Sequence, residues 1–304
     1  MIDGRIKLRH ISCFLEVASR AGFGRAAEAL HLTQPAVSRA IAELEEILGA
    51  SLFDRGRGGT TLTAKGRAFQ AHAGAAFVEL GRGIDTLRHP DGGAPATLSV
   101  GALPTVAARI MPRAVQRAKA AGLAGIIAIE AGPNGWLLEE LKQGRLDLVV
   151  GRLAGPKVMT GLAFEHLYSE PIVFVARPGH PAHTGHMVGL TEIVRHPLIL
   201  PGKSSIIRPE IDRLFLLEGV SGPSEWIETT DPSFSRAYVL ASDAVWVISQ
   251  GVVTGDLDDG ALVRLPLSTA ISGGPVGLTT RAGHGPSPDA ELFLGAVREV
   301  ARGL

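Results

Sequence analysis

The segment that most constrains the fold is residues 24–48, GRAAEALHLTQPAVSRAIAELEEIL, which has the pattern of two short helices joined by a tight turn. Its second half carries apolar residues spaced by four, three and four positions: Val37, Ile41, Leu44 and Leu48. A helix turns by about 100° per residue, so this spacing gathers the apolar side chains on one face, which we expect to pack inward.

The opposite face of this predicted helix presents small or hydrogen-bonding residues, which permit close approach to base edges and phosphates: Pro35, Ser38, Arg39 and Ala42. Thr33 is placed as the N-cap, and Gln34 and Pro35 occupy the first turn, where the missing N–H of proline does no harm. The free N–H groups of that turn would point at a phosphate. We therefore expect this helix to lie in a groove of DNA, with contacts from Thr33, Gln34, Pro35, Ser38 and Arg39.

The preceding residues supply the supporting parts of a helix-turn-helix. Residues 8–21 are predicted to form a first helix, and residues 25–31 the first member of the helix pair. The inward face of the first helix is expected to hold Leu8, Ile11, Leu15 and Ala18, with Phe14 and Val17 beside it. The inward face of residues 25–31 is expected to hold Ala26, Ala27 and Leu30.

The segment that follows the helix pair is predicted to be a wing. Residues 51–63, SLFDRGRGGTTLT, have the pattern of two short strands around a glycine-rich turn. Arg55 and Arg57 near the tip suit contact with phosphates or the minor groove, and the alternative is a pair of solvated loop arginines. Residues 1–63 are therefore predicted to be a winged helix-turn-helix domain that binds DNA.

Residues 64–88 are predicted to form one long helix. Its apolar residues alternate by four and three, the spacing of a coiled-coil seam: Phe69, Ala73, Ala76, Leu80 and Leu87, with Ile84 covering for Gly83. Because so short a segment has no core of its own, the expected partner is the same helix of a second copy of the chain. Residues 89–95, HPDGGAP, break the helix and are predicted to be a hinge.

From residue 96 to 304 strands alternate with helices, the pattern of an α/β domain with mostly parallel sheets covered on both faces. Strands are predicted at residues 97–102, 126–131, 147–151, 172–176, 198–200, 226–228, 244–248, 262–265 and 276–280, and helices at 106–121, 134–144, 207–219, 233–241 and 288–302. The β-α-β-α-β order occurs twice, which predicts two lobes with a cleft between them. Lobe I is expected to take about residues 96–165 and 271–304, and lobe II about residues 166–270.

The composition fits a soluble globular protein of two or three domains, with 304 residues, 45% hydrophobic and 20% charged. Lys plus Arg equals Asp plus Glu at 30 each, so net charge alone does not indicate nucleic acid. Cys13 is the single cysteine, which excludes a disulfide framework within one chain. Neither a signal peptide nor a long apolar span is visible, so we expect a cytoplasmic protein without membrane contact.

Catalysis and metal binding find little support in the sequence. Lys203 stands where a phosphate-binding loop would end, but Pro197 occupies the place of that loop's first glycine. His180, His183 and His186 lie in RPGHPAHTGH without an acidic or cysteine partner nearby, which favours a surface turn over a metal sensor. We predict no enzyme activity, no cofactor and no metal site. A second alternative is a small-molecule binding protein whose N-terminal helices serve only dimerisation.

The order of these parts, with AAEALHLTQPAVSRAIAELEEILGASLFDR near the front, resembles the LysR-type transcriptional regulators over essentially the whole chain. The resemblance implies a winged helix-turn-helix, a linker helix that pairs two subunits, and an effector domain of the periplasmic-binding-protein type (type 2). The partners that it implies are double-stranded operator DNA, a small-molecule effector, further copies of the chain in a dimer or tetramer, and RNA polymerase.

Within that family, further segments are similar to the regulators of protocatechuate catabolism: IDGRIKLRH, GALPTVAARIMP, LDLVVGRLAGP, FEHLYSE, SDAVWVISQGVV and GPVGLTTR. That similarity implies an activator whose inducer is β-carboxy-cis,cis-muconate, a tricarboxylate. The alternative is a regulator of sugar or other aromatic-acid metabolism with a different effector.

Effector-binding candidates follow from the rule that ligands bind outside the carboxyl ends of strands in α/β sheets. The loops at those ends contain the neutral groups Thr105, Asn134, Ser204, Ser205 and Thr230 and the cations Lys203 and Arg208. Together with helix N-termini they favour a small carboxylate over a neutral sugar, although each hydroxyl could equally be an N-cap. Arg152 directly follows a predicted strand, in the place of an arginine that takes part in ligand binding in some aromatic-responsive relatives; the alternative is a structural ion pair.

Overall fold

The computed structural model describes residues 3–56, 59–88, 97–220, 222–223, 225–267, 273–283 and 285–304. The chain divides into two compact units, Met1–Pro95 with Lys142–Arg145 and Ala96–Leu141 with Leu146–Leu304. In the described ranges, no helix has the length and apolar character needed to cross a bilayer.

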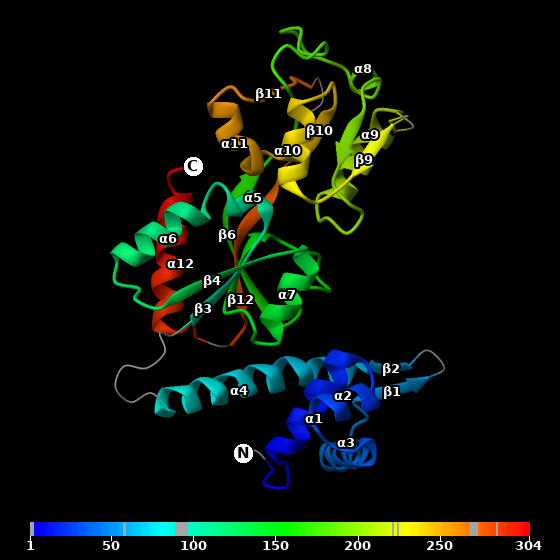
Figure 1. Ribbon diagram of the computed structural model, residues 1–304, viewed down its shortest axis with the longest axis vertical. Coiled ribbons are helices and arrows are strands. Elements are labelled where there is room, and N and C mark those ends of the chain that lie inside the picture. Colours follow the sequence, from blue (N-terminus) through cyan, green and yellow to red (C-terminus); the bar gives the residue numbers. More distant parts are fainter. Residues whose placement is uncertain are drawn as a thin grey trace. The chain divides into compact units, whose positions relative to one another are not determined.

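The N-terminal unit is a winged helix-turn-helix followed by a long helix (Figure 1). Its elements are α1 (Leu8–Arg20), α2 (Phe23–Ala29), α3 (Gln34–Leu48), β1 (Phe53–Gly56), β2 (Gly59–Leu62) and α4 (Ala64–Arg88). The ring centroid of Phe14 lies 5.4 Å from that of Phe53 and 5.1 Å from that of Phe69. One aromatic cluster therefore joins α1, the hairpin and α4 in a single core.

The inward face of α1 differs from the predicted one at the start of the helix. Leu8, which was expected to face inward, is 61% exposed. The buried residues of α1 are His10, Cys13, Phe14 and Val17. A polar contact accounts for the difference, because His10 Nε2 lies 3.1 Å from Glu43 Oε2 of α3. Ile11, Leu15 and Ala18 are half-buried and pack against the same core as Phe14 and Val17, as predicted. The prediction was therefore wrong at Leu8 and missed His10 and Cys13, which do not count as apolar in a periodicity.

The turn between α2 and α3 is set by backbone conformation. α2 begins and ends about two residues before the predicted range 25–31. His31 has a left-handed backbone with φ of 53°, which stops the chain from continuing as a helix. Thr33 is the N-cap of α3, as predicted, and Gly49 ends α3 with φ of 61°.

α4 is one continuous helix, as the sequence predicted for residues 64–88. Phe69 and Ala73 of the predicted seam pack into the core of the N-terminal unit instead of facing a second helix. Leu80 and Ile84 are each 49% exposed, so only the later part of the seam is open to a partner. Pairing with a second copy remains a prediction. The predicted hinge at residues 89–95 lies outside the described residues.

The second unit consists of two lobes, each built on a five-stranded sheet within the described residues (Figure 1). Lobe I contains β3 (Thr97–Ala102), α5 (Pro104–Ala107), α6 (Met111–Ala120), β4 (Ile126–Ala131), α7 (Asn134–Lys142), β5 (Leu148–Arg152), β6 (Leu162–Glu170), β12 (Gly274–Arg281) and α12 (Pro288–Ala301). Lobe II contains β7 (Ile172–Ala176), α8 (Leu190–Ile193), β8 (Leu198–Leu200), α9 (Arg208–Leu217), β9 (Trp226–Glu228), α10 (Pro232–Leu240), β10 (Val245–Ser249), α11 (Gln250–Asp258) and β11 (Val263–Arg264).

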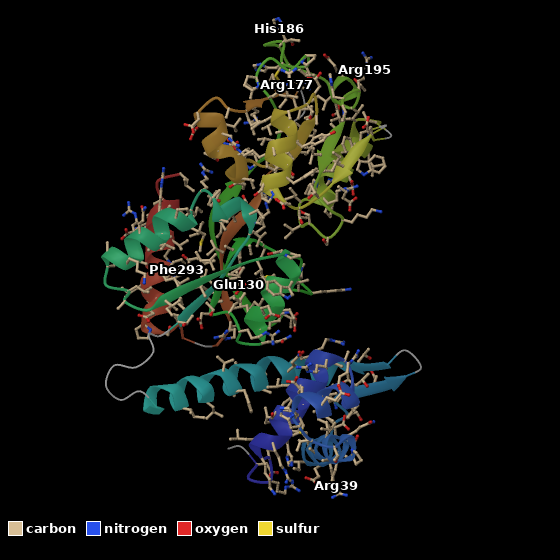
Figure 2. All side chains as sticks on the ribbon, viewed as in Figure 1. Arg39, Glu130, Arg177, His186, Arg195 and Phe293 are labelled. Carbon is tan, nitrogen blue, oxygen red and sulfur yellow. The ribbon has the colours of Figure 1, made fainter. Side chains whose placement is uncertain are left out.

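The sheet of lobe I has the strand order β4-β3-β5-β12-β6. Alternate side chains of each central strand face opposite layers, so that Val100 and Val150 pack under α6 and α12, whereas Val149 packs against α7. α6 and α12 lie side by side on their face of the sheet (Figure 1). Phe293 of α12 is fully buried in that layer and is labelled in Figure 2.

The sheet of lobe II has the order β11-β7-β10-β8-β9 and the same two-sided packing. Phe174 and Val247 pack against α8 and α9, whereas Trp246 packs with α10 and α11. The chain enters lobe II between β6 and β7, at Pro171, and returns to lobe I between β11 and β12. The chain therefore crosses between the lobes twice, as the predicted lobe bounds imply, and lobe I extends to Glu170 rather than to about residue 165.

Several predicted elements of this unit were wrong. The predicted helix 106–121 is broken into α5 and α6, because Pro112 begins a new helix in its first turn. The long strand β6 was missed, since polar residues such as Glu165 and His166 interrupt the apolar pattern of an edge strand. α11 was missed because its sequence, QGVVTGDLD, holds two glycines. The sheets are mixed rather than mostly parallel, with β12 antiparallel to both β5 and β6.

Candidate functional site

The exposed face of α3 is the first candidate site. Val37, Ile41 and Leu44 are fully buried, so one side of the helix packs against the core and the other side faces solvent. The presented side holds Gln34, Pro35, Arg39 and Ala42, all exposed, and half-buried Ser38 lies at its border with the core. Figure 2 shows Arg39 at the outer side of α3, away from the helices that pack behind it.

The start of α3 is suited to an anion. Thr33 is exposed and its side chain makes no capping hydrogen bond to the helix. The first-turn N–H groups are therefore not capped by this hydroxyl, and helix N-termini attract phosphate.

The predicted wing is present as a two-stranded antiparallel hairpin. Arg55 lies in β1 opposite Thr60 of β2, which places it near the tip. Arg57 lies outside the described residues, so its predicted role stays a prediction.

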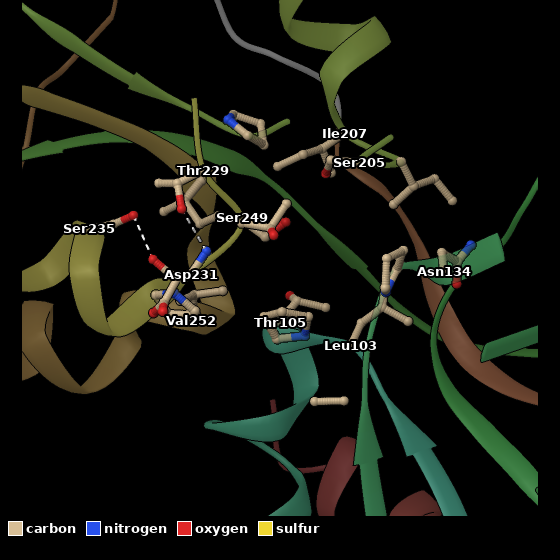
Figure 3. A pocket seen from close by; sticks show the side chains of 18 of the residues that line it. Leu103, Thr105, Asn134, Ser205, Ile207, Thr229, Asp231, Ser235, Ser249 and Val252 are labelled. Carbon is tan, nitrogen blue, oxygen red and sulfur yellow. Dashed lines mark hydrogen bonds between the residues drawn. The ribbon is translucent and has the colours of Figure 1, made fainter. Parts of the chain in front are cut away.

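The second candidate site is a pocket of about 280 Å³ between the two sheets of the effector unit, named here the inter-lobe pocket (Figure 3). Its walls come from both lobes. The lining residues are Leu103, Pro104, Thr105, Ala131, Gly132, Pro133, Asn134, Arg152, Pro201, Ser204, Ser205, Ile206, Ile207, Thr229, Thr230, Asp231, Pro232, Ser235, Trp246, Ile248, Ser249 and Val252.

The lining lies where the sequence argument placed it, at the carboxyl ends of strands. Thr105 follows β3, Asn134 follows β4, Arg152 ends β5 and Thr230 follows β9. Parallel strands that meet at one edge bring the following loops together, although these loops are far apart in the sequence.

Arg152 is the cation of the inter-lobe pocket and is 5% exposed. Its Nη2 donates to the Glu170 carbonyl oxygen over 2.9 Å and to Ser249 Oγ over 3.0 Å. Burial lowers the pKa of Arg152, whereas the charge of Glu170 raises that pKa. An arginine stays protonated in proteins, so a full positive charge stands in this wall.

Three buried polar atoms in the lining lack a hydrogen-bond partner within the described residues: Thr105 Oγ1, Asn134 Oδ1 and Arg152 Nε. Asn134 Nδ2 donates over 3.3 Å to the backbone oxygen of Arg152, so these groups are neighbours. Buried polar groups are nearly always paired with protein, an ordered water or a ligand, so these atoms are open to hydrogen bonds from a polar molecule in the inter-lobe pocket.

Two of the predicted effector residues do not line the inter-lobe pocket. Arg208 donates to Asp212 over 2.7 Å and to Glu228 over 3.3 Å, so its charge is already paired. Lys203 is exposed, and it is its backbone N–H that contacts Glu228 Oε1, at 3.2 Å. The other predicted residues line the pocket: Thr105, Asn134, Arg152, Ser204, Ser205 and Thr230.

Several lining residues were missing from the predicted set: Asp231, Ser235, Trp246 and Ser249. The sequence did contain a signal for Ser249, because this residue ends a buried strand just as Arg152 does. Ligands bind outside the carboxyl ends of strands, so the same argument applies to both residues. A signal for Asp231 also existed, since an aspartate shortly before the predicted helix 233–241 is a preferred N-cap residue.

The histidine loop of lobe II has a structural role for one residue. His180 is 2% exposed, and its Nδ1 accepts from the Ala182 N–H at 3.1 Å. Its other ring nitrogen must then carry the proton and donates to the Asp243 carbonyl oxygen at 3.0 Å. His186 is exposed at the tip of this loop (Figure 2). Among the described residues, no three His, Cys, Asp or Glu side chains form a group that could hold a metal ion.

Both halves of the chain match models of known protein families. The family model described as "Bacterial regulatory helix-turn-helix protein, lysR family" matches residues 8–67, and that described as "LysR substrate binding domain" matches residues 91–302. The HTH-type transcriptional regulator PcaQ of Agrobacterium fabrum is 43% identical over 301 residues, which cover 99% of this chain and 97% of PcaQ.

Solved structures share the fold at lower identity. A full-length variant of OxyR from Pseudomonas aeruginosa is 23% identical with a TM-score of 0.62, over 98% of this chain and 97% of OxyR. ArgP from Mycobacterium tuberculosis is 18% identical with a TM-score of 0.69, over 100% of this chain and 99% of ArgP. The fold of full-length regulators of this type is therefore the fold of this chain.

Proposed function

Because this chain belongs to the LysR family of transcriptional regulators, we propose that it activates genes of protocatechuate catabolism when a small carboxylate binds the inter-lobe pocket. The similarity to PcaQ over nearly the whole of both chains supports the pathway. The acid favoured by the sequence resemblance is β-carboxy-cis,cis-muconate. A regulator of sugar or other aromatic-acid metabolism is the alternative.

One observation carries the carboxylate assignment. Arg152 stands buried in the pocket wall with Nε unpaired, in a lining that also holds the unpaired Thr105 Oγ1. A guanidinium and a hydroxyl are donors that match the oxygens of a carboxylate, and charge-assisted hydrogen bonds of this kind are the strong ones. A neutral sugar would bring no negative charge to this buried cation.

The proposed DNA contacts come from the presented face of α3 and from the wing. Thr33, Gln34, Pro35, Ser38 and Arg39 would contact bases and phosphates, and Arg55 and Arg57 the phosphates or the minor groove. The exposed residues Leu80 and Ile84 in the later part of the α4 seam support pairing of two copies, which would present two such helices to successive half-sites.

We infer a mechanism from the two-lobed pocket. A ligand that contacts both lobes favours the closed arrangement, and closure in paired subunits changes the spacing or bend of the two half-sites. Ligand can shift this equilibrium only by its differential affinity for the two states. A measurement of DNA bending with and without inducer tests this step, and an unchanged bend would count against it.

The first experiment is thermal unfolding of the purified protein with β-carboxy-cis,cis-muconate, cis,cis-muconate, protocatechuate or a simple sugar. A ligand that binds only the folded state raises the unfolding temperature by mass action. We expect a rise with the carboxymuconate. A rise with the sugar alone would keep the DNA-binding half of the proposal and overturn the effector assignment.

A further inference from the structure

The inter-lobe pocket has charges of opposite sign on its two walls. Among its lining residues two carry a charge, Arg152 from lobe I and Asp231 from lobe II. Asp231 forms no ion pair with another described residue. The remaining lining is apolar or carries neutral hydroxyl and amide groups. The buried Glu170 carboxylate lies behind the lining and acts on Arg152, so Asp231 is the charged group of the lobe II wall.

Asp231 is held in place by hydrogen bonds from its side chain and its backbone. Its Oδ1 accepts from the N–H groups of Ser233 at 2.7 Å and Phe234 at 3.1 Å, which makes it the N-cap of α10. Its own N–H donates to Thr229 Oγ1 at 3.1 Å, and its carbonyl oxygen accepts from Ser235 Oγ at 2.8 Å (Figure 3). The carboxylate cannot turn away from a ligand without losing the cap of the helix.

The second carboxylate oxygen of Asp231 is free to act on a ligand. Oδ2 receives no hydrogen bond from the described residues. A hydroxyl group of a ligand could donate to this oxygen, whereas a ligand carboxylate at the same place would meet a like charge. Like charges in direct apposition disfavour binding, and a ligand that fills the pocket displaces part of the water that screens the exposed Asp231.

We propose that Asp231 is a specificity-determining residue, which disfavours effectors that turn an acidic group toward lobe II and favours those that present a hydrogen-bond donor there. The inference rests on the proposed effector pocket. A bound acid is then oriented, with a carboxylate at Arg152 and its uncharged or donor end at Asp231. A tricarboxylate must turn its remaining carboxylates away from Asp231, toward other parts of the pocket such as the Ser204 and Ser205 loop.

The test is the substitution Asp231→Asn, which removes the charge and keeps the cap, because Asn and Asp are equally good N-caps. Affinities are measured by titration calorimetry on the full-length protein for β-carboxy-cis,cis-muconate, cis,cis-muconate and protocatechuate, in that order a tri-, di- and monocarboxylate. We expect D231N to bind the tricarboxylate about tenfold more tightly and the dicarboxylate by a smaller factor. Protocatechuate, which carries hydroxyl groups, should bind D231N no more tightly than the wild type. The gain for the tricarboxylate should shrink at high salt.

Asp259→Asn is the matched control, because Asp259 is an exposed aspartate of lobe II that does not line the pocket. It should leave the three affinities within about twofold of the wild type. Should D231N prove unfolded by circular dichroism, Asp231→Ser, which also caps a helix, replaces it. If D231N changed the affinity for all three acids by the same factor, or left the affinity for the tricarboxylate unchanged, the proposed role of Asp231 would be overturned. Failure of all three acids to bind either protein would instead overturn the proposed carboxylate effector.

Discussion

Arg152 Nη2 donates a hydrogen bond of 3.0 Å to Ser249 Oγ, and so joins the last residue of β5 in lobe I to the last residue of β10 in lobe II. Both residues also line the inter-lobe pocket. The group that would bind an effector carboxylate is therefore the group that connects the two lobes, and we expect occupancy of the pocket to act directly on their contact.

The first prediction concerns Arg152. Lysine keeps the charge but not the planar fork that reaches both Ser249 Oγ and the Glu170 carbonyl oxygen. Arg152→Lys should weaken effector binding by about tenfold to a hundredfold, the range of a charge-assisted hydrogen bond. Titration calorimetry on protein checked for folding by circular dichroism measures this. Arg208→Lys is the matched control, because Arg208 lies outside the pocket lining, and an equal loss in both variants would refute the assignment.

The second prediction concerns the close approach of α11 to lobe I. A Cβ added at Gly251 would collide with the Thr105 carbonyl oxygen and lie 2.7 Å from Glu170 Oε1, which already accepts a hydrogen bond from the Gly251 N–H. Gly251→Ala should lower the free energy of unfolding by about 1–3 kcal/mol, as overpacking does. Urea unfolding measures this change.

Gly255 offers a control in the same helix, since a Cβ there meets no atom within 4 Å. Gly255→Ala should raise the free energy of unfolding by about 0.5–1 kcal/mol, because alanine is the better helix former. If both variants changed the free energy of unfolding by the same amount and in the same direction, the close contact at Gly251 would not contribute to stability.

The third prediction concerns DNA. Arg39→Ala removes an exposed cation from α3 and should weaken binding to a promoter fragment by about tenfold or more while leaving effector affinity intact. If Arg39 contacts a phosphate, the slope of log affinity against log salt should fall by about one for each subunit bound. Fluorescence anisotropy measures both quantities. Arg20→Ala, an exposed arginine of α1 paired with Glu16, is the control that should retain affinity.

The fourth prediction concerns pH. Burial lowers the pKa of His180 below its ordinary value of 6.5, while its hydrogen bond to the Asp243 backbone opposes this. Below about pH 6.5 the unfolded chain takes up a proton that the folded chain excludes, so the free energy of unfolding falls as the pH is lowered. The contribution of one such group reaches at most about 1.4 kcal/mol per pH unit.

Urea unfolding at a series of pH values checks this for wild type and His180→Gln. The variant should be less stable at neutral pH, since it loses the bonds to Ala182 and Asp243, but its stability should depend less on pH. His186→Gln, a change at an exposed histidine, should keep the pH dependence of the wild type. An unaltered slope in His180→Gln would contradict the prediction.

The sequence by itself determined the DNA-binding half almost completely. The spacing of Val37, Ile41 and Leu44 defines one face of α3, and Thr33 defines its start, because these are local properties of a helix. The α/β alternation likewise predicted most strands of the two lobes, since buried strands are continuous apolar runs. The order of elements also gave the two crossovers and the strand ends where the pocket lies.

Only the tertiary structure decided which side chains come together in the wall of the inter-lobe pocket. Arg208 and Arg152 look alike in the sequence, but Arg208 is paired with Asp212 and Glu228 outside the lining, whereas Arg152 is buried beside Ser249. The inward position of His10 depends in the same way on Glu43, which lies on another helix. Arg208 and Asp212 form a local i,i+4 pair on α9, but the pairings of Arg208 with Glu228, Arg152 with Ser249 and His10 with Glu43 join residues distant in the chain. No local pattern of hydrophobicity or helix propensity encodes these distant pairings, because each is set by the packing of one element against another.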